Sequence, residues 1–225
     1  MDKNITETPI HVVDFEGSLT SGVLEWGVVS IIGNSIFKTQ SRLCGNRSSL
    51  SEKEVQQHGI SEALIKDLEP FEADWDLFAG LRQSGPLCAH HAIIENGFLR
   101  KTWAYPRASR DFLAKDPNKT VADWGPWLDT LQIYRRLYPG LESYQLDHLV
   151  KVFEIRDKLE SLAKSHCPQG RGRFHCALFD ALASALLIMR LFEQKELVDL
   201  SLYQLFIFSS NSSAQLKDRS QQELL

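Results

Sequence analysis

The chain has 225 residues, 43% of them hydrophobic and 24% charged, which is an ordinary globular composition with enough length to bury one sizeable core. Its formal net charge of -4 excludes a protein that coats long nucleic acid through bulk positive charge, so any contact with nucleic acid must be local. We expect one domain over residues 1–208. Residues 209–225 are rich in Ser and Gln and predict a disordered tail.

The cysteines and the N-terminus indicate the cellular compartment. Four cysteines stand apart with no Cys-x-x-Cys spacing, and no apolar run precedes a cleavage site near the N-terminus. We therefore expect a reduced, cytoplasmic protein. The longest apolar stretch, residues 176–191, contains Asp180 and Arg190 and is shorter than the roughly 20 residues of a membrane span. It predicts a buried helix and no membrane contact.

The N-terminal segment carries three strand patterns. An apolar run over residues 9–14 and a β-branched run over residues 26–32 come first. Gly33-Asn34 is a hairpin turn signal, and the alternating segment 35–43 follows it. The pattern predicts three consecutive, mostly antiparallel strands.

Helical periodicity begins after these strands. It runs over residues 51–83, with Ser51 as an N-cap paired with Glu54 and a break at His58-Gly59. We expect at least two helices in this region.

A strand and a helix are predicted next. Residues 86–90 form a short apolar run, and residues 92–101 have the helical pattern, with Ile93, Ile94 and Phe98 expected to face inward.

The second half of the chain alternates loops, one strand and helices. We expect a surface connection over residues 100–120, a fifth strand within 121–129, helices over 129–137, 144–153, 155–163 and 174–192, and a closing segment over 197–208. Strands that alternate with helices in this way predict an α/β fold with a mixed five-stranded sheet flanked by helices. Catalytic side chains gather at strand ends in such sheets.

Two carboxylates follow the first strand pattern. Asp14 and Glu16 are two residues apart, and residues i and i+2 of a strand point to the same face. Anions so close repel unless a cation or proton lies between them, and oxygen-rich sites favour magnesium or manganese. On this pair alone, a solvated strand end is the simpler interpretation.

A histidine and an aspartate mark the start of the most apolar helix. His175 precedes Asp180 by five positions, and Asp180 has only apolar neighbours in the sequence. An unpaired buried charge is costly, so Asp180 needs a partner. A metal ion would satisfy it, and so would a salt bridge to an arginine such as Arg190. The segment alone leaves both open.

The chain resembles the DEDDh, or DnaQ-like, 3′-5′ exonucleases of the ribonuclease H-like superfamily when these segments are taken together. The three motifs are Asp14-Phe15-Glu16, His90-His91-Ala92-Ile93-Ile94-Glu95, and His175 through Asp180-Ala181. Lesser marks are His58-Gly59-Ile60, Asp129-Thr130-Leu131 and Tyr138-Pro139-Gly140.

The chain departs from the family pattern at the second motif. Glu95 stands where the family carries aspartate, and His91 where it usually carries asparagine. Gly17-Ser18 follows Glu16 where many members have threonines. The charge of the site is kept, while its geometry is altered.

The resemblance implies a two-metal hydrolysis that releases nucleoside monophosphates from DNA or RNA 3′ ends. Asp14, Glu16, Glu95 and Asp180 would hold two Mg²⁺ or Mn²⁺ ions. His175 would be the general base, since a neutral imidazole can accept the proton of the attacking water near neutral pH.

The resemblance also suggests substrate contacts. Gly17 would let the backbone approach the terminal sugar or phosphate, and Phe15 is a further expected substrate contact. Arg171 and Arg173 would hold phosphates of the scissile strand, with solvated loop charges as an equal alternative. We expect single-stranded 3′ ends as the substrate and leave open a polymerase or another protein as partner.

Other functions compete with the active exonuclease. A catalytically weakened or inactive nucleic-acid-binding module is the main alternative, because Glu95 alters the second motif. Endonuclease chemistry is a weaker one. His166-Cys167 and His175-Cys176 suggest zinc, but zinc sites usually separate paired ligands by two or more residues.

Overall fold

A mixed five-stranded sheet forms the centre of the computed structural model, which describes residues 7–46, 48–114, 116–194 and 200–210. The strand order is β3-β2-β1-β4-β7. β1, β2 and β3 pair antiparallel, whereas β4 runs parallel to both β1 and β7. The predicted α/β class with a mixed sheet is confirmed. The strands are β1 (Ile10–Ser18), β2 (Gly22–Ile32), β3 (Ser35–Leu43), β4 (Leu87–Ala89) and β7 (Trp127–Asp129).

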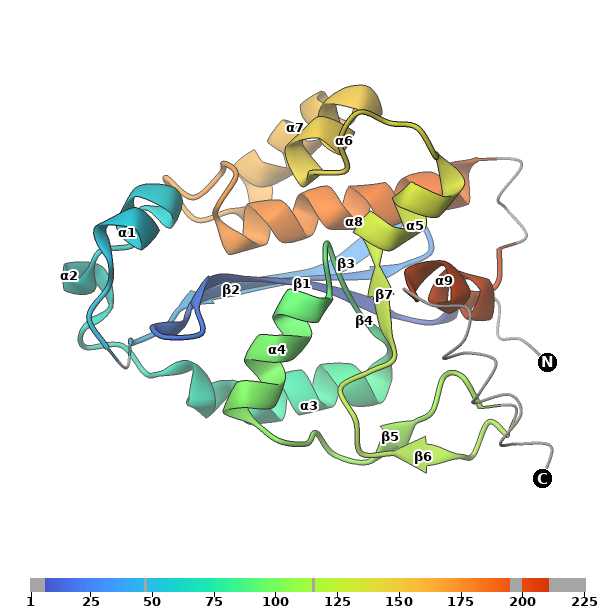
Figure 1. The fold of residues 1–225 in the computed structure, drawn as a ribbon, viewed down its shortest axis with the longest axis horizontal. Coiled ribbons are helices and arrows are strands. Elements are labelled where there is room, and N and C mark those ends of the chain that lie inside the picture. The colour runs from blue at the N-terminus through green and yellow to red at the C-terminus, as the bar shows by residue number, and fades with distance from the viewer. Residues whose placement is uncertain (1–6, 47, 115, 195–199, 211–225) are drawn as a thin grey trace.

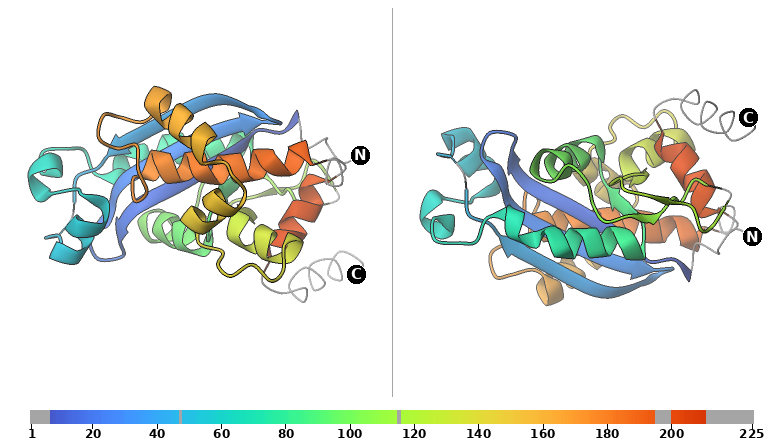
Figure 2. Two further views of the ribbon diagram at one scale, coloured as in Figure 1. Left: turned by 90° about the horizontal axis from the view of Figure 1, so that it is seen from above. Right: turned by 90° about the horizontal axis from the view of Figure 1, so that it is seen from below.

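Helices cover both faces of the sheet (Figure 1, Figure 2). One layer holds α8 (Ala177–Glu193) with α5 (Thr130–Leu137), α6 (Leu146–Val152) and α7 (Arg156–His166), and the other holds α3 (Trp75–Ser84) and α4 (Ile93–Thr102). The remaining described elements are α1 (Glu52–His58), α2 (Glu62–Ile65), η2 (Phe71–Asp74), α9 (Leu202–Ser209) and the small strands β5 (Ser109–Arg110) and β6 (Thr120–Val121).

The pleat of β1 separates two cores. Val12 packs in the core that contains α8, whereas Val13 and Phe15 pack in the core that contains α3 and α4. Successive side chains of a strand point to opposite faces. Asp14 and Glu16 alternate along the strand with Val13 and Phe15, so their side chains lie on the same face as Val12, which is the face covered by α8.

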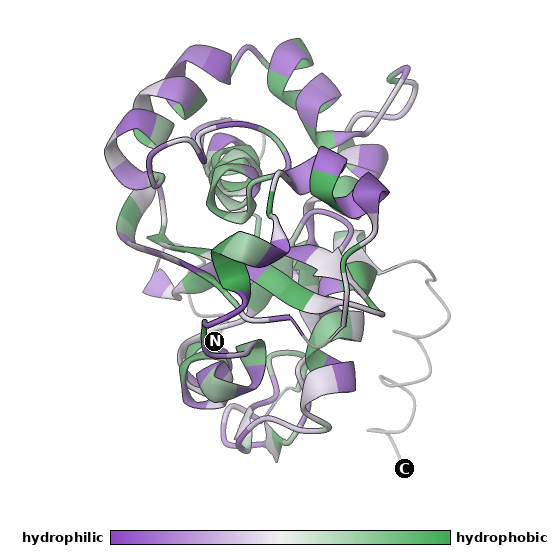
Figure 3. Cartoon of the chain, turned by 90° about the vertical axis from the view of Figure 1, so that its left-hand side faces the viewer, coloured by the Kyte–Doolittle hydropathy of each residue, from purple (hydrophilic) through white to green (hydrophobic). Residues whose placement is uncertain are grey.

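α8 is the buried helix that its composition predicts. It lies among the sheet and the surrounding helices, whose outward faces are hydrophilic (Figure 3). The helix begins at Ala177 rather than at the predicted residue 174, because His175 has a left-handed φ of 61°. That conformation cannot continue a right-handed helix.

Local signals of the N-terminal region are confirmed. β3 covers the predicted residues 35–43. Ser51 forms a capping box with Glu54, and α1 ends at Gly59, whose φ is 72°. Glycine adopts this conformation without a steric penalty, which explains the break.

Three expectations about element positions need correction. β1 continues to Ser18 with a bulge after Glu16, so the two carboxylates lie within the strand rather than at its end. Ile93 and Ile94 were expected to face inward but are 63% and 49% exposed. The buried side chains of α4 are Glu95, Phe98 and Leu99. The predicted surface connection over residues 100–120 contains β5 and contributes to β6.

The C-terminal expectations are tested only in part. α9 packs on β7 and α5, within the predicted closing segment. The predicted disordered tail lies outside the described residues from position 211 onward. Among the described residues, no helix is both long enough and apolar enough to cross a membrane.

Gly27 of β2 allows α8 to approach the sheet, which gives a first prediction. A Cβ atom at this position would lie 2.3 Å from the backbone nitrogen of Leu178. We expect Gly27→Ala to lower the free energy of unfolding by about 1–3 kcal/mol, the usual range for overpacking, in a denaturant titration.

Gly80→Ala is the matched control. Gly80 lies inside α3, and an added Cβ meets nothing within 4 Å. This variant should gain about 0.5–1 kcal/mol of stability because alanine favours helix. Equal effects of the two variants would contradict the close approach of α8 to β2.

Candidate metal-binding active site

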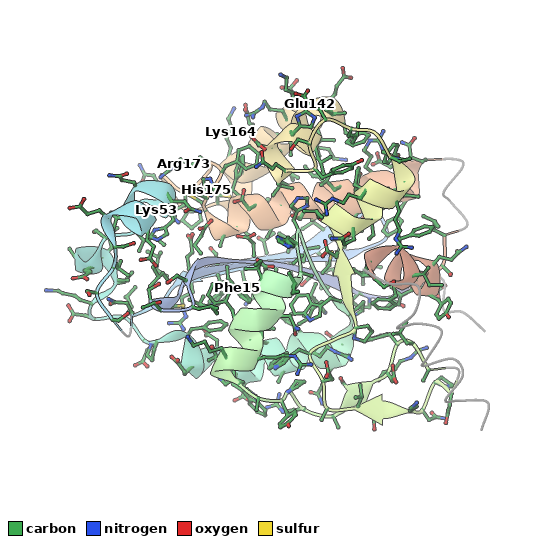
Figure 4. The ribbon with its side chains drawn as sticks, in the orientation of Figure 1. Phe15, Lys53, Glu142, Lys164, Arg173 and His175 are labelled. Atoms are coloured by element: carbon green, nitrogen blue, oxygen red, sulfur yellow. The ribbon has the colours of Figure 1, made fainter. Side chains whose placement is uncertain are left out.

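Carboxyl groups from three elements lie close enough around β1 for their charges to interact. Asp14 and Glu16 come from the strand, Glu95 from the first turn of α4, and Asp180 from the first turn of α8. His175 stands just before α8 and is labelled in Figure 4. Ligand atoms of Glu16, His175 and Asp180 all lie within 4.8 Å of one another. This cluster joins the first and third sequence motifs, and Glu95 of the second motif lies near enough for its charge to raise the pKa of Asp14.

The buried carboxyl groups strongly favour their protonated forms when no cation is bound. Burial, followed by the charges of Asp180, Glu16 and Glu95, raises the pKa of Asp14 well above its ordinary value. Burial, then the charge of Asp180, raises the pKa of Glu16 to about 8. Burial is also the main cause that raises the pKa of Glu95 to about 8 and that of Asp180 to about 7.

Two carboxylate oxygens in this group have no protein partner. Asp180 Oδ1 and Glu95 Oε2 are buried and accept no hydrogen bond within the described part of the chain. Buried polar atoms without a partner are uncommon, and a bound ion is one explanation for them. Hard oxygen donors at high negative charge are the ligands that Mg²⁺ and Mn²⁺ prefer. The donor set therefore fits divalent cations.

The salt-bridge alternative for Asp180 is wrong. Arg190 donates a hydrogen bond to the hydroxyl of Tyr138 at 3.0 Å, and its guanidinium lies 4.3 Å from the ring centre of Phe153. Asp180 Oδ2 instead accepts the backbone N–H of His175 at 3.0 Å. One Asp180 oxygen thus fixes the backbone of His175, while the other is free for a ligand.

Asp129 is a buried carboxylate that the sequence analysis treated only as a minor family mark. It accepts the backbone N–H groups of His91 at 3.1 Å and Ala92 at 3.0 Å, and it also caps α5 through Leu131. Asp129 therefore holds the turn that leads into Glu95. Its position directly after the strand and before a helix is the N-cap signal that could have identified it.

Arg171 does not have the role that the sequence suggested. Its guanidinium forms a salt bridge with the buried Glu25 of β2, with Nε donating to Oε1 at 2.9 Å. Nη1 donates to the backbone carbonyl of His58 at 2.6 Å. These contacts hold the guanidinium, whose side chain is 15% exposed, against Glu25 and the end of α1. Glu25 could not be identified from the sequence, because no local pattern marks a partner 146 positions away.

Phe15 and Gly17 also serve the fold. Phe15 is 6% exposed and packs edge-on against Phe71, Phe78 and Phe98, so its side chain is not available to a substrate. Gly17 has a φ of 138°, and a Cβ atom there would lie 2.1 Å from the backbone carbonyl oxygen of Gly22 in the β1–β2 hairpin. The bulge itself requires glycine at this position.

Arg173 keeps the position expected of a substrate contact. It is exposed and lies two residues before His175. It lines a groove of about 430 Å³ between α7 and the loop over residues 167–174, together with Lys164, Arg156 and Glu160. Arg156 pairs with Glu160 at 3.2 Å, whereas Arg173 and Lys164 form no ion pair with any described residue.

Comparisons with known proteins agree with the motifs. No family model matches the chain. The chain is 24% identical over 200 residues to the DNA polymerase III PolC-type of Oceanobacillus iheyensis, which covers 86% of this chain and 12% of that protein. It is 27% identical over 139 residues to the PolC-type polymerase of Caldanaerobacter subterraneus subsp. tengcongensis, which covers 62% and 9%. The chain spans about a tenth of the length of these relatives.

Solved structures share the fold. Exonuclease X in complex with 5′ overhanging duplex DNA has a TM-score of 0.63 at 22% identity, covering 89% of this chain and 99% of that chain. The nuclease domain of 3′hExo, a DEDDh family member bound to rAMP, has a TM-score of 0.59 at 15% identity, covering 83% and 92%. The fold is thus that of the ribonuclease H-like exonucleases. The motifs and the PolC-type relatives agree with a likeness to the DnaQ-like, DEDDh-type 3′-5′ exonucleases.

The raised pKa values predict that the metal-free protein loses stability as the pH rises. The folded state keeps protons on Glu16, Glu95 and Asp180 up to about pH 7 or 8, whereas the unfolded chain releases them near pH 4. Unfolding therefore releases protons between these limits, and its free energy falls as the pH increases through that window. The melting temperature without metal should be higher at about pH 5.5 than at about pH 8.

Manganese should reverse this trend, because its ligands must be deprotonated. The rise in melting temperature on adding Mn²⁺ should be larger at about pH 8 than at about pH 5.5. Asp180→Asn should flatten the pH dependence and reduce the effect of Mn²⁺. A metal-free melting temperature that increases over this pH range would contradict the assignment of buried, repelling carboxyl groups.

Proposed function

We propose that the chain is a metal-dependent 3′-5′ exonuclease that releases nucleoside monophosphates from nucleic acid 3′ ends. The observation that carries the proposal is the gathering of four carboxyl groups near His175, of which Glu16, Glu95 and Asp180 are buried, and two of which have oxygens without a partner among the described residues. Asp14, Glu16, Glu95 and Asp180 are the residues that would hold divalent ions. When bound, a pair of such ions activates water and neutralises charge at the scissile phosphate.

His175 supplies the proton acceptor in this proposal. Its imidazole is exposed at the rim of the carboxylate group, and its ligand atom lies within 4.8 Å of those of Glu16 and Asp180. A neutral imidazole there takes the proton of the attacking water, and water's oxygen forms the new bond to phosphorus while the 3′ oxygen of the shortened strand leaves. Asp180 keeps the backbone of His175 in place.

Nucleic acid would reach the site along the basic side of the loop over residues 167–174. Arg173 and Lys164 are unpaired cations on the same groove, and phosphate contacts of this kind position a strand without reading its sequence. Because the chain's net charge is -4, this local pair would contribute most of the attraction. Single-stranded 3′ ends are the substrate that we propose, as either DNA or RNA.

A nuclease assay tests the proposal. Purified protein with end-labelled DNA and RNA should give a ladder of 3′-shortened products with Mg²⁺ or Mn²⁺ and none with chelator. Asp14→Asn and Asp180→Asn should abolish cleavage, and His175→Ala should lower the rate by about 10²- to 10⁴-fold.

Asp157→Asn, on the exposed first turn of α7, is the control and should leave the rate unchanged. Undiminished cutting in excess chelator, or products that are internal fragments only, would exclude the proposed mechanism. An inert wild type would favour the non-catalytic module.

Glu95 provides a separate prediction about the metal. Glutamate carries one more methylene than the family's aspartate, and its buried carboxylate must either reach past the family's metal position or adopt a less favoured rotamer. Magnesium demands near-ideal octahedral geometry. We expect an enzyme that is more active with Mn²⁺ than with Mg²⁺.

Two substitutions isolate this effect. Glu95→Asp should raise the magnesium-supported rate or leave it unchanged, while Glu95→Gln should lower the rate with both metals. If Glu95→Gln cleaves as fast as the wild type in both metals, Glu95 is not a ligand. If the wild type is inert and Glu95→Asp cleaves, the natural chain is a non-catalytic relative.

A further inference from the structure

A buried carboxylate outside the metal-binding group fixes the loop that carries His175. Glu25 lies on β2 directly opposite Glu16 of β1 and is 2% exposed. It receives both Nε and Nη2 of Arg171, and its Oε2 also accepts the backbone N–H of Ala177 at 2.9 Å. Its charge is therefore balanced by one arginine and one amide.

These contacts fall on both sides of His175 in the sequence. Arg171 is four residues before it and Ala177 two residues after it. Arg171 reaches further, to the carbonyl of His58 at the end of α1. The segment that contains His175 is thus tied at each end to the sheet, and at one end to α1 as well.

His175 itself has little to hold it. Its φ of 61° is one that residues other than glycine rarely adopt, and its side chain makes no hydrogen bond to any described residue. Only its backbone N–H is bound, to Asp180. The position of the imidazole therefore depends on the backbone on either side of it, which is the part that Glu25 and Arg171 fix.

We propose that the Glu25–Arg171 pair is a positioning device for His175. This inference rests on the proposed nuclease function, in which His175 accepts the proton of the attacking water. Neither residue touches the substrate or a metal in this proposal. Both act through the backbone of residues 171–177, which they hold against β2.

The chemistry of the pair suggests graded variants. Glu25→Gln keeps a carbonyl acceptor for the Ala177 amide but removes the charge that binds Arg171. Arg171→Lys keeps the charge but cannot form the two parallel hydrogen bonds of a guanidinium. Removing one partner of a buried pair leaves the other uncompensated, so the conservative Arg171→Lys variant should disturb the loop least.

A double-mutant cycle with His175→Ala tests the proposal. At saturating metal and substrate, Glu25→Gln should lower kcat on the order of 100-fold, as expected for a misplaced catalytic group, with KM unchanged. The kcat of Arg171→Lys should lie between that of Glu25→Gln and that of the wild type. In the His175→Ala background, Glu25→Gln should cause no further loss, because the group that it positions is gone.

Asp74→Asn is the matched control. Asp74 also forms a salt bridge with an arginine, Arg42 of β3, whose Nε and Nη2 both donate to Oδ2, and neither residue belongs to the loop. The Asp74→Asn variant should lower the free energy of unfolding without changing kcat. Hydrogen exchange gives an independent readout: Glu25→Gln should speed exchange of amides in residues 171–177 while the sheet amides stay protected, and Asp74→Asn should not.

The outcomes separate the two proposals. If the wild type cleaves but Glu25→Gln and His175→Ala lower kcat additively, the pair does not act through His175 and the inference is overturned. Unchanged exchange of residues 171–177 in Glu25→Gln overturns it as well, whether or not the protein cleaves. A wild type without activity overturns the proposed function instead, and exchange then still tests whether the pair holds the loop.

Discussion

Repulsion between buried carboxylates is the constraint on which this structure is built. Burial is the largest cause that raises the pKa values of Asp14, Glu16 and Asp180, and the charge of Asp180 adds to the shifts of Asp14 and Glu16. A fold can tolerate such a group only when protons or cations neutralise it. The neighbouring acids are treated differently: Glu25 is neutralised by Arg171, and backbone amides satisfy Asp129. Protein donors thus satisfy Glu25 and Asp129, whereas Glu95 and Asp180 each keep one oxygen without a partner among the described residues, which a ligand could use.

The alternation of β1 makes this separation possible. One face of the strand contributes Phe15 to a cluster of aromatic rings, and the other face presents Asp14 and Glu16 to α8. The aromatic side excludes water and rigidifies the strand, which keeps the two carboxylates in fixed positions. A shift of one residue in the pairing of β1 would exchange the two faces. The register that builds the core therefore also builds the site.

Local patterns predicted most of the fold and the identity of the acidic residues. The strand over residues 35–43, the capping box of Ser51 and the parity of Asp14 with Glu16 all follow from spacing alone, because each depends on neighbours in the sequence. The exposure of Ile93 and Ile94 did not follow. Hydropathy shows which residues are apolar but not which side of a helix meets the sheet, and here α4 is oriented around Phe98 and Glu95.

The two arginines before His175 show why the rest of the site could not be read from the sequence. Arg171 and Arg173 are two positions apart in one basic loop, and no local feature tells them apart. Their roles differ because Glu25 of β2 forms a salt bridge with Arg171, whereas no carboxylate in the described part of the chain forms one with Arg173. The residues within each motif can be recognised from their short spacing in the sequence. Residues that orient them are specified by contacts between distant segments, so they become visible only in the folded chain.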